Sequence, residues 1–195
     1  MTSSTKCSSV WGNQKLGGYP RLYHNASKIA EYIPKCDMYC EPFAGLGTVA
    51  KHVKAEIKIL NDKSEYAYQY LRKHFSTEMI RSLDFEHCIK AYDNPNTFFL
   101  FDPPWNNSIY GNNSKAYLDR DYREYYKKLF EMIPDLKGDW IMCGTNDPWR
   151  CVLCEHNEYP KMEITTKNVI FGKDTTVILI SNKPFVRYNQ KELFN

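Results

Sequence analysis

The sequence predicts an α/β fold in three layers, with a mainly parallel sheet and an antiparallel closing strand. Two observations lead to this prediction. Short apolar runs alternate with segments of helical spacing through most of the chain, a pattern typical of parallel strands joined by helices. The last two runs, 161–170 and 175–181, follow each other closely, as the two strands of an antiparallel pair do.

The first half of the chain is expected to place strands on both sides of a glycine-rich loop. Asn25 is a candidate helix cap, because its side chain can accept a hydrogen bond from a free N–H of the first turn. The expected elements are a helix from Asn25 that ends at Pro34, a strand over 37–41, a helix carrying Val49, Ala50 and Val53, a strand over 57–60, a helix over 66–75, a short strand or turn ending at 83–85 and a helix leading to 93–95.

The second half begins with the apolar run 97–101, which is expected to form a buried central strand. A long polar loop, 106–118, follows. The remaining expected elements are an amphipathic helix over 122–133, a strand over 139–144, a short helix over 149–156 and the closing pair.

Composition is that of an ordinary globular protein. The 195 residues are 43% hydrophobic and 25% charged, so we expect one domain, 17–187, between an arm, 1–16, and a tail, 188–195. The formal net charge of +3 permits a nucleic-acid partner without requiring one. No apolar run has the length of a membrane span, and seven cysteines without a framework spacing indicate a reducing, cytoplasmic compartment.

Asp102-Pro103-Pro104-Trp105 is the candidate catalytic motif. Because it follows the central strand, Asp102 is expected at the carboxyl end of that strand, where open α/β sheets bind ligands. The prolines stiffen the turn and leave carbonyl acceptors without N–H groups. A fixed carboxylate, backbone acceptors and a large aromatic ring suit a planar base that carries an amino group. The simpler interpretation is a strand end with a capping aspartate.

The loop around Gly45 and Gly47 and the acid Asp62 are candidates for binding a second ligand. Glycines let a ligand approach the backbone closely, and a following helix would offer free N–H groups. Asp62 ends the next strand, the position from which an acid holds ribose hydroxyls in dinucleotide-binding folds. Asp62 could instead cap the helix that begins near Ser64, and the two roles are compatible.

Taken in order, these motifs resemble those of the Dam-like adenine-N6 DNA methyltransferases over roughly residues 11–185. The family has an amino-terminal Gly-Gly-Lys, a Glu-Pro-Phe-x-Gly-x-Gly loop, a ribose-binding acid, an acid–aromatic pair, Asp-Pro-Pro-Tyr and a closing strand. The similar segments of this chain are, in the same order, Gly17-Gly18-Tyr19-Pro20, residues 41–47, Asn61-Asp62, Asp84-Phe85, residues 102–105 and residues 178–184.

The resemblance implies a Rossmann-like fold and methyl transfer from S-adenosylmethionine to adenine N6 in DNA, as in restriction–modification. It implies catalytic roles for Asp102, Pro103, Pro104 and Trp105. The residues that it implies for cofactor binding are Trp11, Gly18, Tyr19, Glu41, Pro42, Phe43, Ala44, Gly45, Gly47, Thr48, Asp62, Asp84, Phe85 and Asp102.

The sequence departs from the family in three respects. Tyr19 stands where the family has lysine. Trp105 replaces tyrosine, which gives the tetrapeptide found in eukaryotic mRNA adenosine methyltransferases, although those place their cofactor motif after it. Only residues 63–101, 39 positions, separate Asp62 from Asp102, and family members carry a target-recognition domain in that interval. RNA therefore stays open beside DNA as the substrate.

The implied chemistry needs no covalent intermediate, because a positioned amine attacks the sulfonium methyl directly. Asp102 and the Pro103 carbonyl would accept its two N–H bonds, and Trp105 would stack on a base flipped out of a duplex or taken from a single strand. A carbon-5 pyrimidine methyltransferase would need a nucleophilic cysteine, usually in Pro-Cys, which this sequence lacks. Protein-glutamine methyltransferases use Asn-Pro-Pro-Tyr. A non-catalytic nucleic-acid-binding subunit is a further alternative, disfavoured by the intact glycines and acids.

The polar loop 106–118 is the candidate nucleic-acid reader, because asparagine and serine can reach phosphates and base edges and tyrosine can stack. Its few cations predict weak binding, with help from the 1–16 arm, a second subunit or a homodimer. No metal is expected, since Cys151, Cys154 and His156 have no evident fourth ligand. The candidate nucleic-acid contacts are Asn106, Asn107, Tyr110, Asn112 and Lys115.

Overall fold

The structure, a computed structural model, describes residues 20–103, 122–144, 158–167 and 174–188. In this part of the chain, seven strands form one sheet in the order β3-β2-β1-β4-β5-β7-β6. The first five are parallel, and β7 runs antiparallel to both β5 and β6. The predicted mainly parallel sheet with an antiparallel closing pair is therefore confirmed. The strands are β1 (Cys36–Glu41), β2 (Ala55–Asn61), β3 (Met79–Arg81), β4 (Thr97–Phe101), β5 (Asp139–Gly144), β6 (Lys161–Lys167) and β7 (Asp174–Ser181).

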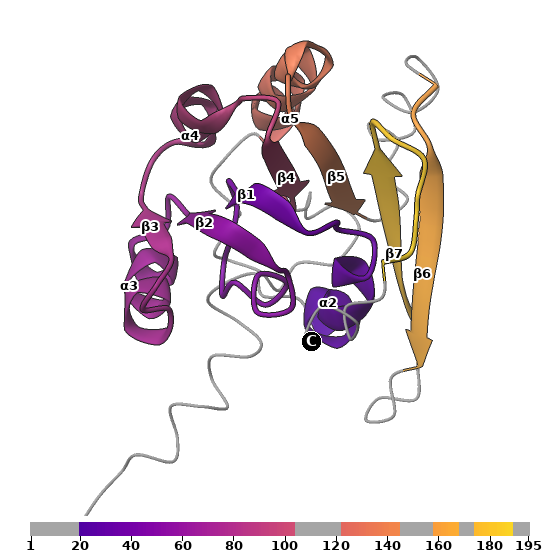
Figure 1. Cartoon of the computed structure of the whole chain (residues 1–195), viewed down its shortest axis with the longest axis horizontal. Coiled ribbons are helices and arrows are strands. Elements are labelled where there is room, and N and C mark those ends of the chain that lie inside the picture. Colours follow the sequence, from indigo (N-terminus) through magenta and orange to yellow (C-terminus); the bar gives the residue numbers. More distant parts are fainter. Residues whose placement is uncertain (1–19, 104–121, 145–157, 168–173, 189–195) are drawn as a thin grey trace, which may run out of the picture.

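Helices cover both faces of the sheet, which gives the three predicted layers (Figure 1). Helices α4 and α5 lie over one face, whereas α2 and α3 contribute to the other. None of the described helices is long and apolar enough to cross a membrane. The helices are α2 (Pro20–Ala30), α3 (Glu65–His74), α4 (Phe85–Tyr92) and α5 (Tyr122–Met132), the last continued by the short 3-10 helix Ile133–Asp135.

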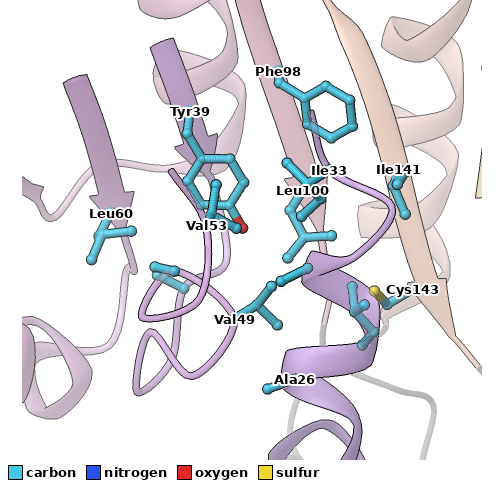
Figure 2. Close-up of a cluster of buried hydrophobic side chains, with 14 of the residues drawn as sticks. Ala26, Ile33, Tyr39, Val49, Val53, Leu60, Phe98, Leu100, Ile141 and Cys143 are labelled. Carbon is cyan, nitrogen blue, oxygen red and sulfur yellow. The ribbon is translucent and has the colours of Figure 1, made fainter. Parts of the chain in front are cut away.

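Each face of the sheet has its own hydrophobic core. All five residues of β4 are buried, as the apolar run 97–101 predicts, and their side chains alternate between the two cores. Figure 2 shows part of the core on the α2 side, where side chains from α2, the loop after β1 and the strands meet. Tyr39 of β1 lies in this core and is fully buried.

Asn25 is not a helix cap, which corrects the prediction. Helix α2 begins at Pro20, so Asn25 lies inside the helix and is 0% exposed. Proline suits a first helical position because the N–H that it lacks would have no helical partner there. The helix ends at Ala30, and Ile33 is buried from the turn that follows, where its N–H donates to the Ala30 carbonyl at 3.1 Å.

The helix expected after Gly45 and Gly47 does not form: residues 45–52, all described, are turns. Both glycines are left-handed, with φ of +53° and +62°, so the chain is still in a turn at Gly47, directly before the segment expected to be helical. Side chains also take the backbone groups of Ala50. Lys58 Nζ donates to the Ala50 carbonyl at 2.9 Å, and the Ala50 N–H bonds to the carboxyl of Glu41. The apolar spacing at 49–53 thus reflects packing on the sheet.

The other expected helices and strands in the described residues are present. Ser64 caps α3, and its side chain accepts a hydrogen bond from the Ala67 N–H. The helix expected over 149–156 and the end of the strand expected over 161–170 lie outside the described residues, as do the 1–16 arm and most of the 188–195 tail. The division of the chain at 16 and 187 stays a prediction.

Candidate active site

Four acidic side chains stand at the ends of four neighbouring parallel strands. Glu41 is the last residue of β1, Asp62 follows β2, Asp84 follows β3 after a short turn, and Asp102 follows β4. Because the strands are parallel, their carboxyl ends share one edge of the sheet. The strand order reverses between β1 and β4, and such a switch point is where open α/β sheets bind ligands. Glu41 and Asp102 lie at this point.

Glu41 is the most deeply buried of the four acids, at 4% exposed. The hydroxyl of Tyr39 donates a hydrogen bond to Glu41 Oε1 at 2.6 Å. Burial raises the pKa of Glu41 to about 8, opposed by the hydrogen bond from Tyr39 and assisted by the negative charge of Asp102. Glu41 is therefore mostly protonated at neutral pH, with burial as the main cause.

The two glycines of the loop have different surroundings. A Cβ on Gly45 would have no heavy atom within 4 Å, so the backbone there is open to a ligand. A Cβ on Gly47 would lie 2.6 Å from the ring of Phe75, so that glycine permits close packing against the end of α3. The positive φ of both positions favours glycine in addition. Of the two, only Gly45 faces open space.

The remaining loop residues of the predicted cofactor site differ in exposure. Pro42 and Ala44 are buried, whereas Phe43 and Thr48 are partly exposed. The Ala44 N–H donates to the Asn61 carbonyl at 2.8 Å, which fixes the loop to the end of β2. Phe43 and Thr48 therefore keep accessible side chains in a loop whose backbone is anchored.

Asp62 bonds to backbone groups on both sides of it. Its Oδ2 accepts from the Gly45 N–H at 2.8 Å, and its Oδ1 accepts from the Ser64 N–H at 2.9 Å. Burial raises the pKa of Asp62, and these two hydrogen bonds oppose the rise. A carboxylate offers about four acceptor positions, so each oxygen keeps a lone pair for a further donor. The N-cap of α3 is Ser64 and not Asp62, which corrects the alternative prediction, and Asp62 binds only the N–H of that cap residue.

Asp84 caps helix α4 and also forms an ion pair. Its Oδ1 accepts from the Glu86 N–H at 3.4 Å, and its Oδ2 lies 2.5 Å from Lys63 Nζ. Burial raises the pKa of Asp84, but the hydrogen bonds and the charge of Lys63 outweigh burial and hold the pKa below its usual value. Asp84, which the resemblance assigns to cofactor binding, is thus already paired with the cation Lys63.

Phe85 lies in the core beneath this edge and is 2% exposed. Its ring packs against Phe43 at 5.3 Å and against Tyr125 of α5 at 4.9 Å, measured between ring centroids. Of the two rings, Phe43 is the more exposed and Phe85 is buried. Phe43 can therefore contact a ligand directly, whereas Phe85 packs against the Phe43 ring from the core.

Asp102 is partly exposed and Pro103 is buried. At the switch point, the Asp102 side chain is therefore accessible from the surface, whereas Pro103 is enclosed. The structure brings together the predicted residues Glu41, Pro42, Phe43, Ala44, Gly45, Asp62, Asp84 and Asp102 along one edge. The predicted residues that lie outside the described ones are Trp11, Gly18, Tyr19, Pro104, Trp105, Asn106, Asn107, Tyr110, Asn112 and Lys115.

Sequence reasoning missed three residues that hold the site together. Tyr39 bonds to Glu41, Lys63 pairs with Asp84, and Asn61 bonds to two loops. Asn61 gives a usable signal, since a polar residue at the buried end of an apolar strand needs hydrogen-bond partners. Lys63 gives none, because an exposed lysine next to a helix cap is typical of many surfaces.

The described residues include no group of three or more His, Cys, Asp or Glu side chains that could hold a metal ion. Cys151, Cys154 and His156 lie outside them. Cys40 and Cys88 are both buried, with their sulfur atoms 3.8 Å apart, and burial is the main reason that the pKa of Cys40 is raised well above its ordinary value. A protonated, enclosed thiol of this kind is a core residue and not a nucleophile.

No protein-family model and no curated protein matches the sequence. Solved structures with a similar fold do exist. A protein from Streptococcus mutans, described as a methyltransferase and solved in complex with SAH, has a TM-score of 0.51 and 12% identity, covering 84% of this chain and 98% of that one.

Two further solved structures have the same fold. An rRNA methylase from Streptococcus thermophilus has a TM-score of 0.52 and 10% identity, with coverage of 85% of this chain and 98% of that one. A precorrin 8W decarboxylase from Methanobacterium thermoautotrophicum has a TM-score of 0.53 and 11% identity, with coverage of 80% and 86%. At these identities the likeness shows the fold alone. It confirms the predicted Rossmann-like class, whereas the site must indicate the reaction.

Proposed function

We propose that the protein transfers a methyl group from S-adenosylmethionine to the N6 amino group of adenine in a nucleic acid, with DNA as the preferred substrate. The observation that carries the proposal is the position of Asp102-Pro103 at the carboxyl end of β4, next to Glu41 at the switch point. The resemblance to Dam-like enzymes assigns the catalytic role to the same dipeptide. The fold, shared with the Streptococcus mutans protein that was solved with SAH, is compatible with it.

The residues along the strand ends fit S-adenosylmethionine. Gly45 presents open space to a ligand, and Asp62 keeps acceptor positions that suit the two ribose hydroxyls. Phe43 offers a partly exposed ring at the same edge. When bound, the cofactor would supply an electrophilic methyl group on a sulfonium centre. In the same fold, the Streptococcus mutans protein holds SAH.

Asp102 and Pro103 would prepare the adenine amine for attack. The Asp102 carboxylate and the Pro103 carbonyl would each accept one N–H, which directs the nitrogen lone pair away from them and toward the methyl group. Burial of Pro103 and its fixed φ hold the second acceptor in place. Since Glu41 is mostly protonated at neutral pH, it leaves Asp102 as the charged acceptor.

The interval between Asp62 and Asp102 favours a second candidate substrate, adenosine in RNA or in single-stranded nucleic acid. All of residues 63–101 are described, and they are taken up by α3, β3, α4, β4 and the connections between these elements. This interval therefore leaves no room for the target-recognition domain that Dam-like enzymes carry there. Duplex contacts would have to come from outside it, from the 106–118 loop, from the 1–16 arm or from a second subunit.

The proposal is tested by incubating the protein with methyl-labelled S-adenosylmethionine and, separately, duplex DNA, single-stranded DNA and RNA. The products are digested to nucleosides and identified by mass spectrometry. We expect N6-methyldeoxyadenosine from DNA, and labelled N6-methyladenosine from RNA would select the second candidate. Label in a cytosine, or no transfer to any polynucleotide by protein that binds the cofactor, would overturn the proposal.

Replacing Asp62 by alanine is expected to weaken cofactor binding by roughly 1–3 kcal/mol, because the ribose hydroxyls lose their acceptors and the Gly45 N–H loses its partner. Calorimetric titration with S-adenosylhomocysteine measures the change. Asp37→Ala, an exposed acid at the amino end of β1, is the matched control and should bind as wild type does. Equal affinity of the Asp62 and Asp37 variants would remove Asp62 from the site.

A further inference from the structure

Asn61, the last residue of β2, bonds to a loop on each side of its strand. Its Nδ2 donates to the carbonyls of Pro42 and Leu83, at 3.0 Å each. Its Oδ1 accepts from the Leu83 N–H at 2.7 Å. The side chain is 0% exposed, so water cannot replace these bonds. One buried amide thus joins the loop after β1 to the turn before α4.

The residues next to Asn61 reinforce the same connection. The Asn61 carbonyl accepts from the Ala44 N–H at 2.8 Å, and Asp62 accepts from the Gly45 N–H, so the loop has three bonds to the end of β2. On the other side, Lys63 pairs with Asp84 in the turn that Asn61 holds. The end of β2 therefore lies between the two segments and bonds to both.

We infer that Asn61 is a positioning residue that sets the separation between the 42–45 loop and the 83–84 turn. The inference rests on the proposed function in one respect, namely that these segments form two walls of the S-adenosylmethionine site. The chemistry of the amide explains the choice of residue. The carbonyls of Pro42 and Leu83 need hydrogen-bond donors, and the Leu83 N–H needs an acceptor. Asparagine supplies two donors and one acceptor from one short, neutral group.

Asn61→Asp is the sharpest test because it keeps the shape and replaces the donor nitrogen. An oxygen would then face the carbonyl oxygens of Pro42 and Leu83, and the two walls should move apart. Asn96→Asp, the same change at an exposed position before β4, is the matched control. If the first variant does not fold, Asn61→Ala, which adds no charge, replaces it.

The test uses one measurement with ligand and one without. Affinity for S-adenosylhomocysteine is expected to fall on the order of tenfold or more, as a buried polar group left unpaired would predict. In turnover, the KM for S-adenosylmethionine should rise while kcat stays within a few-fold, since Asp102 lies on another strand. Without ligand, amide hydrogen exchange should quicken at both 43–45 and 83–84 and stay unchanged in β5.

The two measurements separate this inference from the proposed function. If the wild type binds no S-adenosylhomocysteine, the proposed function fails, and exchange at the two segments alone decides whether Asn61 couples them. Suppose that exchange in the Asn61 variant quickens equally in β5 and that its affinity for S-adenosylhomocysteine is unchanged. Asn61 would then contribute only to overall stability. Unchanged exchange at either segment would overturn the inference.

Discussion

Replacing Asp102 by alanine is expected to slow methyl transfer by roughly 10²–10³-fold, the usual effect of removing a positioned hydrogen-bonding group from an active site. Affinity for S-adenosylhomocysteine should change little, because Asp62 and the Gly45 loop, on other strands, provide the predicted cofactor contacts. The reason lies in the nucleophile. Without Asp102, the adenine amine loses an acceptor that orients its lone pair. Single-turnover rates with labelled cofactor and calorimetric titration measure the two quantities separately.

Two control variants make the Asp102 result specific. Asp102→Asn keeps the size of the side chain but presents a donor in place of one oxygen, so it should also be slow. Asp37→Ala removes an acid from the amino end of β1, at the opposite edge of the sheet, and should leave the rate unchanged. A rate for Asp102→Ala within a few-fold of wild type would exclude the proposed mechanism, whatever the cofactor affinity.

The strand ends of this protein could be predicted from the sequence because local patterns determine them. The apolar run 97–101 is long enough for one buried strand, and Asp102 and Pro103 follow it directly. Likewise Asp62 follows an apolar run, and Asp84 precedes a helix that its side chain caps. Once strands alternate with helices, parallel pairing brings these acids to one edge. Most of the candidate site needed no further information.

The two local errors both come from reading side-chain spacing alone, which shows neither where a helix starts nor which groups bind its backbone. Asn25 has the chemistry of a cap, but Pro20 starts the helix earlier and places Asn25 inside it. Ala50 lies in a segment with helical spacing, but side chains from β1 and β2 bind its backbone groups. Those side chains are Glu41 and Lys58, nine and eight residues from Ala50 and on the strands before and after the loop, so the spacing within 49–53 could not show the competition.

The contacts that hold the site together were also beyond sequence reasoning. Asn61 bonds to Pro42 and Leu83, 19 and 22 residues away, and Lys63 bonds to Asp84, 21 residues away. Such pairs depend on which strands become neighbours and in which register. In the observed register Asn61 lies beside Arg81 of β3, which brings the turn at Leu83 within reach. Register is a property of the folded sheet and cannot be predicted from any single segment of the sequence.

Glu41→Gln is expected to change the pH dependence of folding stability. The pKa of Glu41 rises from an ordinary value of 4.5 to about 8 in the folded protein, mainly through burial. Between these values the unfolded chain has released a proton that the folded chain retains, so rising pH favours unfolding. The stability that this site contributes is complete below about pH 4.5 and is lost as pH rises to about 8. Glutamine cannot ionise, so the variant should not show this loss.

The expected difference reaches a few kcal/mol at alkaline pH, given that one pKa unit corresponds to roughly 1.4 kcal/mol. Free energies of unfolding from urea titrations at pH 5 to 9 should therefore fall with pH in the wild type and much less in Glu41→Gln. Glu56→Gln, an exposed acid of β2, controls for the loss of charge and should follow the wild type. Parallel curves for wild type and Glu41→Gln would show that Glu41 is ionised in the folded protein. Two negative charges would then adjoin at the switch point, and Asp102 would no longer be the single charged acceptor there.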